Sequence, residues 1–379
     1  MKVAQRVYVI SNPDVDSAGA LALSYLVECL KHAAQVSLHR SIDQIRMANG
    51  DIVIFHYIDS MTQLEAVSSA KMVRVGLFDP KPSQIKYLHY VNFLIVSSRE
   101  QREVFLPYCR NIFTFLMFPN RTAPVGQKCN EKNFRLSNDA KGIKIVYHGN
   151  LIHLNSIWAT LIPALCKVSE YRNVIFIVVY NIEKHGLWKF GRPDNDALTI
   201  IDYQWHSDWA AEILDSDNTI GVVPFYTPVM RVPFINRLTY RLYLGSKLDH
   251  LLSFKSSTNP GRILVFADRG VPVIAESVPS SESLIEDGFS GRLVLSAEGW
   301  RDAFLELVDD KEKRKLFGSR LKNVVDIKVE PLTIAKDIMR FFDSIEVSQG
   351  FTERLDIKRP SYIRAFATLI VRKLRRHSR

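Results

Sequence analysis

The segment Phe254–Leu295 reads FKSSTNPGRILVFADRGVPVIAESVPSSESLIEDGFSGRLVL, and its pattern is that of one helix followed by two short strands. The apolar positions of its first third predict a helix over Asn259–Arg269. The unbroken apolar run Val271–Ala275 predicts a buried strand, and Arg292–Leu295 predicts another. A helix that leads directly into a buried strand is the repeating unit of a parallel α/β sheet, so this segment indicates that class of fold.

The start of this helix is a candidate anion site. Hydroxyl and amide side chains that can cap a helix precede Pro260, which we expect in the first turn. Free backbone N–H groups and the helix dipole favour negative charge there, and nearby cations favour a phosphate-bearing ligand. An ordinary surface helix with exposed basic residues would have the same composition. The residues that we assign to a nucleoside diphosphate at this helix start are Lys255, Ser257, Thr258, Asn259 and Arg262.

The same alternation of strand and helix extends outward through the chain. Short apolar runs alternate with helical patterns, which predicts parallel sheets with helices on both faces. The pattern breaks over 121–142, a polar segment with proline and glycine, and then begins again. We therefore predict an α/β protein of two doubly wound Rossmann-like domains facing a cleft, with 1–120 and 143–330 as the domains, 121–142 as the linker and 331–379 as C-terminal helices. The expected strands are Arg6–Ser11, Val36–Arg40, Asp51–His56, Met72–Phe78, Asn92–Ser97, Ile143–His148, Asn173–Tyr180, Ile200–Tyr203 and Thr219–Val223, and the main helices Ala18–Ala33, Arg99–Tyr108, Ser156–Glu170 and Ser207–Asp215.

Composition agrees with a cytoplasmic protein of this size. The 379 residues suit two domains of roughly 150 residues each. The chain begins without the apolar core of a signal peptide, and its longest apolar run, Val174–Tyr180, is far shorter than the ~20 residues that span a bilayer. The cysteines Cys29, Cys109, Cys129 and Cys166 are scattered without metal-ligand spacing, so we expect free thiols in a reducing compartment.

The positive charge of the chain is concentrated in its tail. Residues 351–379 contain nine Lys and Arg against two acidic residues, a net charge of +7 out of +10 for the whole chain. The remainder is close to neutral, so we expect no nucleic-acid partner. Residues 360–379 form a basic amphipathic pattern, which predicts binding to an anionic membrane surface at the inner face of the cell membrane. The alternative is a helix that packs on the N-terminal domain or on a partner.

Common nucleotide and metal motifs are missing. The sequence has no GxGxxG after a strand and no GxxxxGK[ST]. Three Asp-x-Asp pairs occur, but none lies at the carboxyl end of a strand in the way a metal-dependent sugar transferase needs. Turn formation and helix capping explain these pairs, so we expect no metal. The pairs are Asp14/Asp16, Asp194/Asp196 and Asp215/Asp217.

Several ordered motifs in 143–342 together resemble the C-terminal domain of GT-B glycosyltransferases of the family 4/family 1 type. The run GVPVIA from Gly270 resembles the family's helix-to-strand step, and SLIEDG from Ser283, with Gly291, resembles its "ELI-DG-NG" element. The turn YHGN from Tyr147 is similar to the glycine turn beside the donor phosphates. Trp300, Leu307 and Arg314 fall where the family has its "W…L…D…R" helices, and Trp205 to Val223 resembles its "W…L…DIGIVP" segment.

The resemblance implies a hexosyltransferase that moves a sugar from a nucleoside-diphosphate sugar to a glycan or lipid-linked acceptor in cell-envelope or capsular polysaccharide biosynthesis, without a further cofactor. It places His148, Gly149 and Asn150 against the donor diphosphate. Many retaining members carry Glu-x7-Glu, but this chain has Ser257 and Val265 at those positions. The stereochemical outcome therefore stays open. Two alternatives also stay open: a sugar-nucleotide 2-epimerase, and a non-catalytic scaffold of a polysaccharide assembly complex.

The N-terminal half is expected to supply the acceptor side. His56 ends a strand, where a group that titrates near neutrality can act as a base. Asp14 and Asp79 follow strands at the edge of the sheet where ligands gather, and we assign both as catalytic candidates. For each of these residues a structural role at the end of a strand is the alternative. His153, near the YHGN turn, is a further candidate for contact with phosphate.

Overall fold

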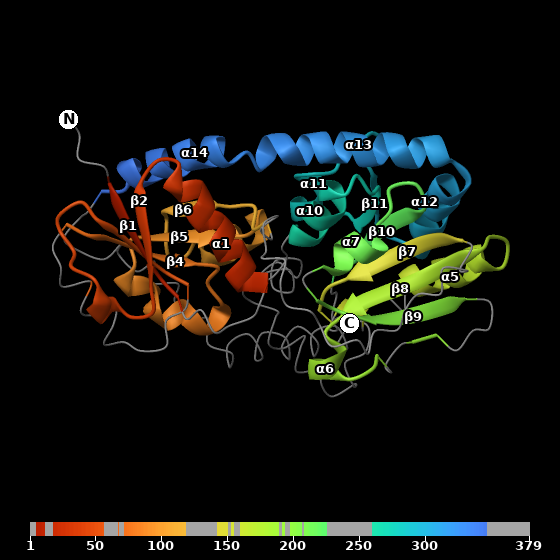
Figure 1. Cartoon of the computed structure of the whole chain (residues 1–379), viewed down its shortest axis with the longest axis horizontal. Helices are drawn as coiled ribbons and strands as arrows, with labels where there is room; N and C mark the ends of the chain where they lie inside the picture. Colours follow the sequence, from red (N-terminus) through yellow and green to blue (C-terminus); the bar gives the residue numbers. More distant parts are fainter. Residues whose placement is uncertain are drawn as a thin grey trace, which may run out of the picture.

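The computed structural model describes residues 5–11, 18–56, 67, 72–118, 142–150, 153–154, 160–188, 192–193, 198–206, 208–225 and 260–346. Two parallel sheets, each with helices around it, lie side by side, and helices α13 and α14 run across both (Figure 1). This confirms the prediction of an α/β protein with two doubly wound domains.

The N-terminal sheet has six parallel strands in the order β2-β1-β3-β4-β5-β6. Its inner strands β3 and β5 are buried at every position, as expected for strands covered on both faces, whereas the edge strands β2 and β6 are half-buried to exposed. The domain contains one strand that the sequence pattern did not predict, β6. Its helices are α1, α3 and two 3-10 helices. The elements are β1 (Arg6–Ile10), α1 (Ala18–Lys31), β2 (Gln35–His39), η1 (Ile42–Gln44), β3 (Ile52–Phe55), β4 (Arg74–Phe78), η2 (Pro82–Tyr90), β5 (Phe93–Val96), α3 (Arg99–Phe105) and β6 (Ile112–Thr114).

The C-terminal sheet also has six parallel strands, in the order β12-β11-β10-β7-β8-β9. Its central strands β8 and β10 are buried throughout. This is the strand order of a dinucleotide-binding Rossmann fold. The elements are β7 (Ile143–His148), α5 (Leu161–Ser169), β8 (Val174–Tyr180), α6 (Ile182–His185), β9 (Thr199–Gln204), α7 (Trp209–Ile213), β10 (Thr219–Val223), α10 (Gly261–Asp268), β11 (Val273–Glu276), α11 (Pro279–Glu282), β12 (Arg292–Val294), α12 (Ala297–Asp309), α13 (Lys311–Lys328) and α14 (Pro331–Ser344).

Helix α10 begins later than the sequence predicts. Its first residue is Gly261, and Pro260 is the N-cap residue with φ −70° and ψ 0°, without a side-chain capping hydrogen bond. Pro260 therefore precedes the first turn, and the prediction that it lies inside that turn is wrong. The physical reason is that a proline at the N-cap needs no N–H partner, so the chain can enter the helix one residue later.

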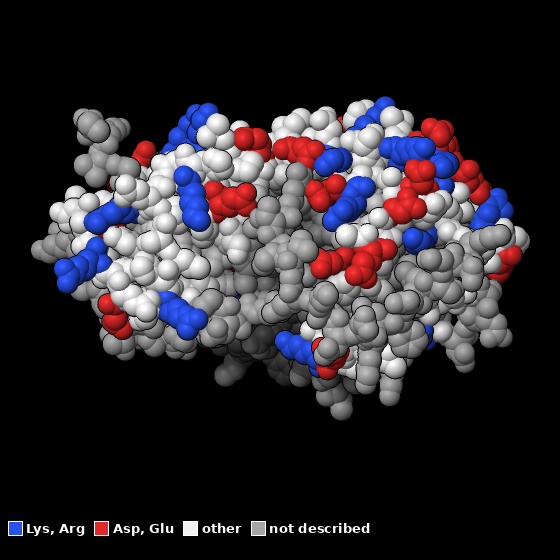
Figure 2. Space-filling model, viewed as in Figure 1, with Lys and Arg blue, Asp and Glu red and all other residues white. Residues whose placement is uncertain are grey.

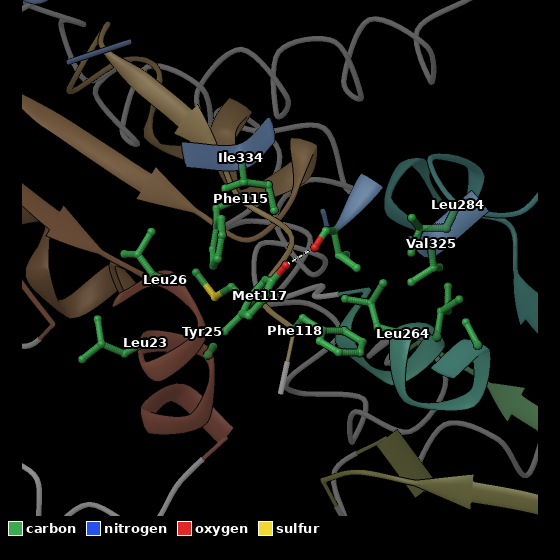
Figure 3. Packing of buried hydrophobic residues seen from close by; sticks show 14 of the residues in the cluster. Leu23, Tyr25, Leu26, Phe115, Met117, Phe118, Leu264, Leu284, Val325 and Ile334 are labelled. Carbon is green, nitrogen blue, oxygen red and sulfur yellow. Dashed lines mark hydrogen bonds between the residues drawn. The ribbon is translucent and has the colours of Figure 1, made fainter. Parts of the chain in front are cut away.

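One of the three hydrophobic clusters among the described residues spans both domains. A single cluster runs from β1 and α1 through Phe115, Met117 and Phe118 to α10, α13 and α14. Figure 3 shows these apolar side chains meeting between the domains, and the Tyr25 hydroxyl donates to the Val329 carbonyl where α13 ends. Helix α13 packs on α10, and α14 packs on α1. The chain thus returns to the N-terminal domain after completing the C-terminal one.

Candidate functional site

Each sheet contains a point where the crossover connections change direction. In the C-terminal sheet, β7 lies between β8 and β10, and in the N-terminal sheet β1 lies between β2 and β3. Ligands of open α/β sheets bind outside the carboxyl ends of the strands at such switch points. The candidate residues His148 and His56 are the last residue of β7 and the residue after β3, so both stand at these points.

The turn after β7 requires glycine. Gly149 has φ +139°, and a Cβ added there would lie 3.0 Å from Arg262 Cδ and 3.1 Å from the Tyr147 hydroxyl oxygen. The Tyr147 hydroxyl donates to the Asn150 carbonyl at 2.7 Å, which closes the turn. A side chain at position 149 would strain the backbone and crowd Arg262. The turn therefore brings the main chain of 149–150 close to the start of helix α10.

Arg262, in the first turn of α10, is the cation at this switch point. Its guanidinium lies 4.8 Å from the Phe225 ring centroid and 5.8 Å from that of Tyr147. Nη1 is buried and has no hydrogen-bond partner among the described residues. Burial lowers the pKa of Arg262, while Tyr147 and Glu276 raise it. Because arginine stays charged in proteins, the site holds a half-buried cation whose Nη1 no described residue pairs.

Glu276 is a carboxylate near Arg262 at the same edge of the sheet. It is the last residue of β11, and its Oε2 accepts a hydrogen bond from the Phe225 N–H at 2.8 Å. The carboxylate raises the pKa of Arg262 through its charge. The sequence analysis did not assign Tyr147, Phe225 or Glu276 to the site. The signal that could have found Phe225 and Glu276 is their place just after β10 and at the end of β11, on the same edge of the sheet as His148.

His148 supports the site from inside the protein. Its Nε2 lies 3.1 Å from the Arg262 carbonyl oxygen, so the neutral ring must carry its proton on Nε2 and donate. The ring centroid is 4.7 Å from Trp209 and 5.0 Å from Phe266. Burial lowers the pKa of His148 to about 3. The ring is therefore neutral near pH 7, and it joins the end of β7 to the first turn of α10.

His153 lies beside the same aromatic residue as Arg262. Its ring is perpendicular to that of Phe225, with centroids 6.5 Å apart. Burial lowers the pKa of His153 well below its usual value, and the charge of Arg262 lowers it further. A neutral imidazole offers a ligand a hydrogen bond but no positive charge, which leaves Arg262 as the cation among the described residues of this switch point.

The N-terminal switch point is built around His56. Its Nδ1 lies 3.1 Å from Ser11 Oγ, and its ring packs edge-on against Phe78 with centroids 5.8 Å apart. Burial lowers the pKa of His56; the Asp79 carboxylate raises it and the Lys81 ammonium lowers it. The imidazole is thus neutral at physiological pH, the state that a general base needs.

Both oxygens of Asp79 are engaged by its own domain. Oδ1 accepts from Gln101 Nε2 at 3.1 Å, and Oδ2 pairs with Lys81. Asp79 has φ 48°, a conformation that aspartate tolerates in turns. The other assigned residues, Asp14, Lys255, Ser257, Thr258 and Asn259, lie outside the described residues.

Comparison with known proteins identifies the fold. The sequence matches no protein-family model and no curated protein. The structure is similar to sucrose-phosphate synthase from Thermosynechococcus elongatus, with TM-score 0.52, 14% sequence identity, and coverage of 89% of this chain and 98% of that chain. Trehalose-6-phosphate synthase gives TM-score 0.54 at 11% identity, covering 90% of this chain and all 100% of the other.

A third similar structure is that of the Anabaena protein HepE in complex with UDP-glucose, with TM-score 0.51, 10% identity, and coverage of 90% of this chain and 100% of that chain. Each of these alignments covers 89–90% of this chain and therefore includes both of its sheets. The chain therefore has the GT-B fold, as the resemblance in the C-terminal half predicts.

Proposed function

We propose that this chain is a glycosyltransferase that moves a hexose from a nucleoside-diphosphate sugar to a glycan or lipid-linked acceptor in the assembly of cell-envelope or capsular polysaccharide. The observation that carries the proposal is Arg262, a half-buried cation at the switch point of a Rossmann-type domain, whose buried Nη1 has no hydrogen-bond partner among the described residues. An unpaired donor of this kind is unfavourable unless a ligand completes it. The donor diphosphate supplies the matching acceptor oxygens and negative charge.

Arg262 and the turn at Gly149 would act together. Because Gly149 has no side chain, a phosphate could approach the main chain of the turn. The guanidinium of Arg262 would stabilise the negative charge that develops on the diphosphate as the glycosidic bond breaks. Lys255, Ser257, Thr258 and Asn259 remain proposed contacts from the sequence. HepE binds UDP-glucose on the same fold, which supports a sugar nucleotide as the ligand. No metal is proposed, because the cationic side chains fill that role.

On the acceptor side, we assign His56 as the general base. Its imidazole is neutral, held at the end of β3, and lies at the switch point of the N-terminal sheet. A neutral imidazole can take the proton from an acceptor hydroxyl as that oxygen bonds to the sugar. Its substitution should lower the turnover number much more than the affinity for the donor.

The tail at 360–379 is proposed to bind an anionic membrane surface, which would bring the enzyme to a lipid-linked acceptor. Figure 2 shows basic and acidic side chains interspersed on the face of the molecule in view. None of the helices within the described residues is long and apolar enough to cross a membrane. Sedimentation with anionic and neutral liposomes, at low and high salt, tests this part of the proposal.

Calorimetric titration with UDP and GDP in the presence of a chelator tests donor binding. We expect binding to persist under chelation, and loss of all binding would refute the metal-independent site. Turnover of sugar nucleotides with and without membrane extract then distinguishes the possible reactions. Release of nucleotide only with extract supports transfer to a lipid-linked acceptor. Release of free nucleotide and free sugar without extract would instead indicate an epimerase.

A further inference from the structure

Backbone hydrogen bonds place Ser11 beside His56. Strands β1 and β3 are parallel with Ile10 opposite Phe55, so Ser11 and His56 hold the next position along each strand. The His56 N–H donates to the Ile10 carbonyl at 3.0 Å, and the Ser11 N–H donates to the His39 carbonyl at 2.9 Å. The sheet therefore fixes both residues, and their side chains meet with Ser11 Oγ 3.1 Å from His56 Nδ1.

The described surroundings of His56 make no hydrogen bond to Nε2 of its imidazole. Ser11 is 6% exposed, and the ring of His56 packs against Phe78 at 61° between the planes. The charged groups around the ring are Asp79, which is engaged by Lys81 and Gln101, and Lys81 itself. The Ser11 hydroxyl is thus the polar group that holds Nδ1.

We propose that Ser11 is a positioning residue for His56, whose hydroxyl oxygen accepts a hydrogen bond from Nδ1–H and so leaves the lone pair of Nε2 free to receive a proton. This inference rests on the proposed function, in which His56 is the general base. A serine hydroxyl can donate or accept, so the direction of this bond decides what the imidazole can do.

The direction follows from the proton that a base must take up. If Ser11 donated to Nδ1, the neutral ring would carry its proton on Nε2 and could not accept another there. If Ser11 accepts from Nδ1–H, the same bond is kept in the neutral and the protonated ring. The acceptor's O–H proton then moves to Nε2, its oxygen bonds to the anomeric carbon, the bond to the diphosphate breaks with its electron pair, and the imidazolium later gives the proton to water.

Nitrogen-15 NMR of the imidazoles in the full-length protein tests the bond without any activity measurement. We expect His56 of the wild type to show the Nδ1–H form. Ser11→Ala should change this distribution and lower the pKa of His56 by about one unit, the effect of losing one hydrogen bond to a charged ring. Ser11→Thr keeps the hydroxyl and should restore the wild-type spectrum.

A matched control exists on the neighbouring strand. Ser37 Oγ lies 2.9 Å from His39 Nε2, so Ser37→Ala removes a serine–histidine bond in the same sheet and should leave the signals of His56 unchanged. A wild-type His56 in the Nε2–H form, or a His56 spectrum that does not respond to Ser11→Ala, would overturn the proposal.

Kinetics connect the bond to turnover. Ser11→Ala should lower the turnover number roughly 10- to 100-fold with little change in UDP affinity, and should move the acid limb of its pH profile down with the pKa of His56. Ser11→Thr should recover most of the loss. If no sugar nucleotide is turned over under any condition, the proposed function fails, while the NMR result still decides whether Ser11 sets the proton position of His56.

Discussion

Replacing Arg262 by methionine should separate binding from stability. Arg262 is the half-buried cation of the proposed donor site, and its buried Nη1 has no hydrogen-bond partner in the part of the chain that the structure describes. Methionine keeps an unbranched apolar stem against Phe225 and Tyr147, where sulfur–aromatic contacts are favourable. The side chain is therefore expected to serve the ligand more than the fold, and the two effects can be measured on one variant.

The expected change in the free energy of unfolding is small. Removing an unpaired buried donor should stabilise the protein by about 1–3 kcal/mol. Loss of the cation–π contacts at 4.8 and 5.8 Å opposes this by about 1–2 kcal/mol in total. The difference lies between a loss of about 1 kcal/mol and a gain of about 2 kcal/mol in the free energy of unfolding. Nucleotide affinity should behave differently, because the lost charged hydrogen bonds correspond to about 1.5–3 kcal/mol, or roughly 10- to 150-fold weaker binding of UDP.

Urea unfolding at pH 7 and calorimetric titration of UDP measure the two quantities. Arg269→Met, at the exposed end of the same helix, is the control and should leave both unchanged. A loss of stability above about 3 kcal/mol for Arg262→Met would refute the reasoning, since that is the effect of breaking a buried ion pair. Such a result would mean that the attraction between the charges of Arg262 and Glu276 stabilises the fold. Unchanged UDP affinity would remove Arg262 from the donor site.

Three further perturbations test the framework around the site. Burial lowers the pKa of His148 from 6.5 to about 3, so between these pH values the unfolded chain binds a proton that the folded chain does not. The free energy of unfolding should therefore fall by about 1.4 kcal/mol per pH unit as the pH is lowered from 6.5 toward 3. Urea unfolding of His148→Phe should show a pH dependence that is smaller by this amount. Gly318→Ala places a Cβ 1.9 Å from the Gly270 carbonyl oxygen, so a loss of at least about 1–3 kcal/mol is expected, and an unchanged melting temperature would contradict the close packing. Glu100, which is 2% exposed, accepts a hydrogen bond from the Ser280 N–H across the domain boundary at 3.1 Å. Amide hydrogen exchange at the start of α11 should therefore become faster in Glu100→Ala and stay unchanged in the control Glu103→Ala. Equal exchange rates in the two variants would refute the contact.

Local sequence pattern was sufficient for most of the fold. Buried parallel strands are continuous apolar runs, so β7 and β10 could be predicted with the boundaries that the structure shows. The strand β6 was not predicted, because IFT at Ile112–Thr114 is short and only partly buried. The start of α10 was placed too early, because Pro260 is acceptable both in a first turn and as the residue before it.

The site was predictable only in part. The positions of His56, His148 and Gly149 at strand ends could be read from the sequence, since they directly follow or close an apolar run. The residues that surround them in space could not be predicted, because these neighbours depend on which strands become adjacent in the sheet. Arg262 meets Phe225 and Glu276 only after β7, β10 and β11 become adjacent in the sheet.

The sequence by itself determined the α/β class, two parallel sheets and the strand-end residues, because burial of each strand and the capping of each turn are local properties. The tertiary structure decided which of the candidate groups are chemically available. It buried His148 against Trp209 and Phe266 and engaged both oxygens of Asp79, and it left Nη1 of Arg262 without a partner among the described residues. Desolvation and hydrogen-bond pairing depend on segments more than 100 residues apart, such as His148 and the Arg262 carbonyl, and no local pattern specifies those contacts.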